Sequence, residues 1–158
     1  MRLFLDTTYL MPLAGLETDK FGKEDAKMLY GLRDFVFVAS PVSLIEIKWV
    51  IIGKTRGDPV LRKRLRREYR LLLDFLLYGD VIELTPLLDE RIDEEENKLL
   101  DLGIADYFDR IIFSTALYHA DALLTEDEAL RETWEKEGYD KIIKLYTWNS
   151  FKLSFLRK

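Results

Sequence analysis

The sequence predicts an α/β fold, a three-layer α/β/α sandwich around a central parallel sheet of about five strands. Short apolar runs alternate with longer segments of helical spacing along the 158 residues, a pattern typical of parallel strands joined by right-handed helical crossovers. The first run, Arg2 to Leu5, is nearly all apolar, as expected for a central strand buried on both faces. No internal repeat, low-complexity tract or linker interrupts the pattern. We therefore expect residues 1–158 to form a single domain.

The first half of the chain begins with two strands. They are expected at residues 2–5 and 35–39, with a short helix at 9–13 that ends near Gly15 and another helix at 24–32. Ser40-Pro41 offers an N-cap followed by proline at the first helical position, which predicts a helix that Gly53 closes. Asp58-Pro59 predicts a further helix to Tyr78, with a basic outer face.

The second half continues the alternation with strands at 81–84, 122–124 and 142–146. Thr85-Pro86 resembles the earlier helix start and predicts a helix through an acidic stretch to Leu102-Gly103. Further helices are expected from near Asp106 and from Asp127 to Lys136. The aromatic tail from Trp148 to Phe155 is expected to form an interface.

Composition excludes several kinds of site. The chain has no cysteine and one histidine, His119, so disulfides, thiolate nucleophiles, cysteine-ligated metals and multi-histidine sites are excluded. His119 is expected to lie at a helix end rather than in a Ser-His-Asp triad. No apolar run approaches the ~20 residues that span a bilayer, and no signal-like leader is recognisable. A soluble, cytoplasmic protein without a membrane partner is expected.

Charge is unevenly distributed along the chain, although the formal net charge is only −5. Nine basic and two acidic residues lie between positions 48 and 70, and the proportions reverse between positions 89 and 109. Such polarity can steer a phosphate ligand to one face, and Lys48, Lys54 and Arg56 belong to the basic run. A solvated helix face is the alternative interpretation of such a run.

Four carboxylates follow apolar segments at points where a strand gives way to a turn or helix: Asp6, Glu46, Asp109 and Asp127. The carboxyl ends of parallel strands share one edge, where open α/β folds bind ligands. Carboxylates crowded at that edge repel one another unless a hard cation neutralises them. The pattern predicts a magnesium or manganese site.

Each acid also has a simpler interpretation. Asp6 and Asp127 could be N-caps, and Glu46 could be the exposed position of an amphipathic helix. Asp106 and Asp109 share a helical face, and Asp106 is the better N-cap candidate, which leaves Asp109 free to point toward the strand ends. The Thr125 hydroxyl could hold a neighbouring carboxylate, while Glu126 is expected to point outward.

Four segments carry a resemblance to the PIN-domain family, and within it to the VapC-like toxin ribonucleases. They are Leu3 to Leu10, Ser43 to Glu46, Gly103 to Ala116 and Ala122 to Asp127. Their order and spacing cover almost the whole chain. The basic and then acidic helical pair is longer than expected for the smallest of these toxins.

The resemblance implies a metal-dependent endoribonuclease that cuts single-stranded RNA and serves as the toxin of a VapBC-type toxin–antitoxin pair. It implies that Mg²⁺ (or Mn²⁺) is held by the catalytic acids Asp6, Glu46, Asp109 and Asp127. Thr8, Thr125 and Asp106 would support these acids. Lys48, Lys54 and Arg56 are the side chains that we then expect to contact the RNA backbone. Homodimers and a VapB-like antitoxin partner are also implied.

Three other functions stay open at the level of sequence. They are a non-toxin PIN nuclease of RNA processing, a non-catalytic PIN-like binding module, and a phosphoryl-transfer or receiver domain with Asp6 as nucleophile. The haloacid-dehalogenase pattern requires a second aspartate two residues after the first, where this chain has Thr8.

Overall fold

A five-stranded parallel sheet lies at the centre of the computed structural model, which describes residues 1–156. Its strands are β1 (Arg2–Leu5), β2 (Val36–Ala39), β3 (Ile82–Leu84), β4 (Ala122–Leu124) and β5 (Lys144–Tyr146). They lie in the order β3-β2-β1-β4-β5. β1 is central, and Leu3 pairs with Phe37 of β2 on one side and Ala122 of β4 on the other. The predicted parallel sheet is confirmed.

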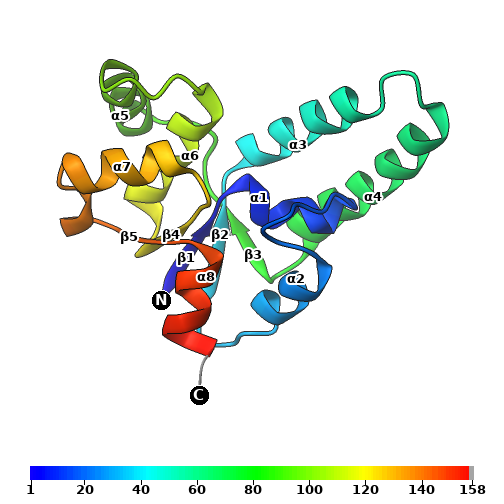
Figure 1. The fold of residues 1–158 in the computed structure, drawn as a ribbon, viewed down its shortest axis with the longest axis horizontal. Helices are drawn as coiled ribbons and strands as arrows, with labels where there is room; N and C mark the ends of the chain where they lie inside the picture. The colour runs from blue at the N-terminus through cyan, green and yellow to red at the C-terminus, as the bar shows by residue number, and fades with distance from the viewer. Residues whose placement is uncertain (157–158) are drawn as a thin grey trace.

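Helices cover both faces of this sheet (Figure 1). One face carries α1 (Thr7–Leu10), the 3₁₀ helix η1 (Met11–Ala14), α2 (Lys23–Tyr30), α3 (Pro41–Lys54), α4 (Pro59–Tyr78), α8 (Trp148–Phe151) and the π-helical turn η3 (Lys152–Leu156). The other carries α5 (Glu90–Asp101), α6 (Tyr107–His119), α7 (Glu128–Lys136) and the 3₁₀ helix η2 (Tyr139–Lys141).

The alternation of side chains along β1 divides the core between these two faces. Leu3 and Leu5 belong to the first cluster of buried side chains, and Phe4, between them, belongs to the second. All three are fully buried, as the apolar run predicted for a strand covered on both sides. Within residues 1–156, no helix is long and apolar enough to cross a bilayer.

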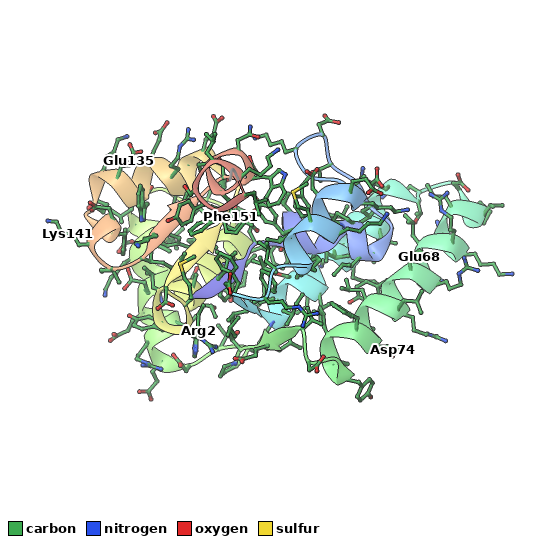
Figure 2. The ribbon with its side chains drawn as sticks, turned by 90° about the horizontal axis from the view of Figure 1, so that it is seen from below. Arg2, Glu68, Asp74, Glu135, Lys141 and Phe151 are labelled. Carbon is green, nitrogen blue, oxygen red and sulfur yellow. The ribbon has the colours of Figure 1, made fainter. Side chains whose placement is uncertain are left out.

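α3 and α4 form an antiparallel hairpin that extends beyond the sheet (Figure 1). Figure 2 shows Glu68 and Asp74 of α4 at the opposite end of the molecule from Glu135 and Lys141. The expectation that Gly53 closes α3 is wrong, because Gly53 lies inside the helix. The helix ends at Lys54, and its C-cap is Thr55, whose hydroxyl donates to the Ile51 carbonyl. Gly57 takes the positive φ of the turn that follows, +78°.

The helix start predicted at Thr85-Pro86 is also wrong. α5 begins at Glu90, after Asp89, whose carboxylate accepts the Arg91 and Ile92 backbone N–H groups. The Thr85 hydroxyl instead donates to the Pro86 carbonyl. Thr85-Pro86 thus ends β3, and the N-cap is formed by the aspartate four residues later.

A buried ion pair fixes α5 against α6. Arg110 Nε donates to Glu96 Oε1 at 2.5 Å, and both side chains are less than 10% exposed. Arg110 Nη1 also donates to the carbonyl oxygens of Ile104 and Ala105, which precede α6. The guanidinium therefore anchors the segment that leads into the first turn of α6.

Breaking this pair by Glu96→Ala should lower the free energy of unfolding by about 3–5 kcal/mol, because it leaves a buried guanidinium without a counter-charge. Glu94→Ala removes an exposed carboxylate from the same helix and should change stability by less than about 0.5 kcal/mol. Urea unfolding followed by circular dichroism measures both. Equal effects of the two substitutions would show that the pair has no special role.

Candidate functional site

The predicted acids gather at the carboxyl edge of the sheet. Asp6 directly follows β1, Asp127 follows β4 by three residues, Glu46 lies in α3, and Asp109 lies in the first turn of α6. The chain leaves β1 toward β2 on one side, and β4 lies on the other, so this edge contains the topological switch point where open α/β sheets bind ligands. One pocket, here called the carboxylate pocket, is lined by Asp6, Thr8, Thr18, Asp19, Lys20, Glu46, Asp109, Glu126 and Asp127.

Asp6 is the most buried acid of this pocket, with 7% of its surface exposed. Its Oδ1 accepts the Thr7 backbone N–H, and its Oδ2 accepts the Thr125 hydroxyl at 2.6 Å. Burial is the main cause that raises the pKa of Asp6 from 3.8 to about 7; the charges of Glu46 and Asp127 contribute to this rise, and the hydrogen bond from Thr125 opposes it. Asp6 therefore caps α1 and also faces the pocket, so capping does not exclude a functional role.

Glu46 is held by a residue that sequence reasoning missed. Thr7 Oγ1 donates to Glu46 Oε2, while Thr8, the predicted supporting residue, lines the pocket. Burial raises the pKa of Glu46, and the charges of Asp109 and Asp106 contribute to the rise. Two threonines, Thr7 and Thr8, follow Asp6 in the sequence, and either could have been the supporting residue. The packing of α1 against α3 brings Thr7 to Glu46.

Asp106 and Asp109 lie as predicted, with Asp106 as the N-cap of α6 and Asp109 directed to the pocket. Asp106 Oδ1 accepts the Phe108 and Asp109 backbone N–H groups and caps α6. Asp109 is half-buried and lines the pocket. Burial, together with the charges of Asp6, Asp127 and Asp106, raises its pKa from 3.8 to about 7.

The segment after β4 supplies three polar side chains. Thr125 is fully buried and holds Asp6, and its Oγ1 also accepts the Asp127 backbone N–H. Asp127 caps α7 through Leu130 N and also lines the pocket. The expectation that Glu126 points outward is wrong, because its Oε1 accepts both the Tyr9 hydroxyl and the Trp148 backbone N–H at 2.7 Å.

The predicted RNA-binding residues do not reach this pocket. Lys48 and Arg56 line a separate hollow between α3 and α4, together with Ile51, Ile52, Arg62 and Arg66. Lys54 ends α3 and lines neither hollow. Among residues 1–156, Lys20 is the only basic side chain that lines the carboxylate pocket.

The donors of the carboxylate pocket suit a hard divalent cation. Carboxylate and hydroxyl oxygens are the ligands that Mg²⁺ and Mn²⁺ prefer. Burial raises the pKa values of Asp6 and Asp109, and the charges of neighbouring carboxylates, which a cation would offset, contribute to the rise. Among residues 1–156, however, no group of three or more carboxylate or histidine side chains is arranged closely enough to hold an ion. The chemistry of these donors fits the metal.

Comparison with known proteins finds a matching family model and several solved structures of similar fold. A family model described as PIN domain matches residues 3–136. The crystal structure of VapBC2 from Rickettsia felis, bound to a DNA fragment from its promoter, is similar in fold, with a TM-score of 0.54 at 16% sequence identity. The likeness covers 94% of this chain and 99% of the other. No curated protein matches the sequence.

Stability of the metal-free protein should fall as pH rises from about 4 to about 7. The unfolded carboxyls of Asp6 and Asp109 lose their protons near 3.8, whereas the folded ones keep them up to about 7; the folded state then binds more protons, and the free energy of unfolding decreases with pH. Asp6→Asn removes one such group, so the variant should gain stability relative to wild type across this range. Urea unfolding in EDTA at several pH values measures the difference.

The matched control for this experiment is Asp101→Asn, which alters an exposed carboxylate at the end of α5. It should leave the pH dependence of wild type unchanged. A constant difference between Asp6→Asn and wild type from pH 4.5 to 8 would contradict the raised pKa of Asp6.

Proposed function

The chain belongs to the PIN-domain family, as its sequence motifs indicated, and on that basis we propose that it is a metal-dependent endoribonuclease acting on single-stranded RNA. PIN domains are generally nucleases. The observation that carries the proposal is the meeting of Asp6, Glu46, Asp109 and Asp127, from four separate segments, in one pocket. These four residues are the proposed catalytic acids and metal ligands.

The proposed reaction is hydrolysis of a phosphodiester bond. Mg²⁺ or Mn²⁺, when bound, lowers the pKa of a water molecule and offsets negative charge on the leaving oxygen. The chain's own contribution is to hold oxygen ligands in place: Thr7 N–H and Thr125 orient the two Asp6 oxygens, and the Thr7 hydroxyl orients Glu46. Asp109 and Asp127 complete the lining from the helix starts of α6 and α7.

No histidine base takes part in this proposal. His119 ends α6, and Asp109 lies in the first turn of the same helix. Ten residues of helix separate them, which corresponds to about 15 Å at 1.5 Å per residue. A Ser-His-Asp triad at this pocket is therefore not supported, and carboxylate chemistry remains.

We extend the proposal to a toxin of the VapBC type with a VapB-like antitoxin and a homodimeric state. The likeness in fold to a VapBC complex favours this subfamily. Ile45, Trp49 and Ile52 form an exposed apolar stripe on α3, and such a stripe suits a protein partner. The segment from Trp148 to Phe155 offers less aromatic surface to a partner than the sequence predicted, because Trp148 and Phe151 are buried in the protein's own core.

Asp6→Ala and Asp109→Ala should each lower cleavage of a labelled single-stranded RNA by about 100-fold or more, since loss of even an outer partner of a metal ligand typically costs about 10–100-fold. EDTA should abolish cleavage by the wild type, and Mn²⁺ or Mg²⁺ should restore it. Asp101→Ala, which removes an exposed acid, serves as the control and should cut at the wild-type rate. Full activity in both Asp6→Ala and Asp109→Ala would refute the assignment.

Thr125→Val should weaken Mn²⁺ binding by about 10–100-fold, because it removes the hydroxyl that holds Asp6 Oδ2 in position. Calorimetric titration measures the affinity without any RNA substrate. Thr115→Val is the matched control, because Thr115 is equally buried but donates to the Ile111 carbonyl instead. If both variants bind Mn²⁺ as wild type does, Thr125 has no part in the metal site.

A further inference from the structure

A second polar pocket continues from the carboxylate pocket. Asp19, Lys20 and Glu126 line both, so the two hollows form one groove. The remaining lining residues of the second hollow, here called the α7–α8 pocket, are Asp25, Arg131, Thr147, Trp148, Asn149 and Lys152. They come from the first turn of α2, the first half of α7, the start of α8 with its N-cap Thr147, and the first residue of η3.

Two of the acids in the α7–α8 pocket are engaged by groups inside the protein. Asp25 accepts the Trp148 indole N–H at 2.7 Å and the Gly22 backbone N–H, while Glu126 accepts the Trp148 backbone N–H and the Tyr9 hydroxyl. These bonds fix Trp148, which is 2% exposed, as the floor of the pocket. Both oxygens of Asp25 and one oxygen of Glu126 are therefore occupied by donors of the protein, and the other Glu126 oxygen lies near Lys20.

The cations of the pocket are available to a ligand. The Lys20 side chain is 55% exposed and lies 3.9 Å from Glu126 Oε2, at the limit of an ion pair. Lys152 Nζ lies 5.4 Å from the centre of the Trp148 ring. Arg131 forms no ion pair within the described residues 1–156. Three basic side chains with free hydrogen-bond donors suit a phosphate group.

We infer that the α7–α8 pocket binds a backbone phosphate of the RNA strand next to the phosphate held over the carboxylates, through Lys20, Arg131 and Lys152. This inference rests on the proposed nuclease function. A strand whose cleaved bond lies in the carboxylate pocket must continue into an adjoining hollow. The α7–α8 pocket shares three lining residues with the carboxylate pocket, whereas the α3–α4 hollow that holds Lys48 and Arg56 shares none.

Salt dependence of binding tests the inference directly. A fluorescein-labelled single-stranded RNA is titrated with protein in EDTA, which prevents turnover, and anisotropy gives Kd at several salt concentrations. Lys20→Gln, Arg131→Gln and Lys152→Gln should each weaken binding several-fold and reduce the slope of log Kd against log salt by about 0.7, the value for one lost contact to a single strand. Lys152→Arg should restore the slope. A substitution that merely disturbs packing would not change the slope by this amount.

Lys136→Gln is the matched control, because Lys136 is exposed on the same helix as Arg131 and lies outside the groove. It should keep the wild-type slope. If the wild type cuts RNA in Mn²⁺ but the three groove variants bind with the wild-type slope, the inference is overturned and the proposed function stands. The inference is also overturned if only Lys48, Lys54 and Arg56 variants lower the slope. A wild type that neither binds nor cuts RNA overturns both.

Discussion

Asp6 follows the central strand with only 7% of its surface exposed, and the charges of Glu46 and Asp127 help to raise its pKa. The parallel sheet brings these acids together, because all its strands end at the same edge and the helices that follow them begin there. Several carboxylates kept together out of water are unfavourable unless protons or a cation neutralise them. The rest of the structure can be understood as the frame that holds these acids in place despite their repulsion.

That frame is made of neutral donors and of packing farther away. Thr7 and Thr125 each present a hydroxyl to one acid, so Asp6 and Glu46 keep fixed positions without a basic partner. Arg110 and Glu96 lie behind the start of α6 and fix the segment from which Asp109 emerges. A basic residue inside the cluster would neutralise the acids permanently, whereas hydroxyl donors leave the charge available to a metal ion.

The sequence was sufficient to locate the strands and to predict that the four acids lie at one edge of the sheet, because both follow from local patterns. Apolar runs located the five strands to within two residues at either end, and helix-capping rules separated Asp106 from Asp109.

The contacts that depend on tertiary packing could not be foreseen. Glu126 turns inward only because Tyr9 and Trp148, distant in the chain, offer it donors. Thr85-Pro86 has the composition of a helix start, yet Asp89 provides the cap. The RNA-binding prediction relied on the abundance of basic residues near Lys48, and abundance does not reveal which hollow adjoins the acids.

The central claim is that Asp6, Glu46, Asp109 and Asp127 form one site for a divalent cation. Anomalous scattering from a crystal of the wild-type protein grown with Mn²⁺ measures this most directly, because it locates the ion independently of any activity. We predict an anomalous peak in the carboxylate pocket. The ion at this peak should lie about 2.1 Å from an oxygen of Asp6 and from an oxygen of at least one other of the four acids, the distance typical of a Mg²⁺-like octahedral ion. A pocket that holds no peak at saturating Mn²⁺ would contradict the account.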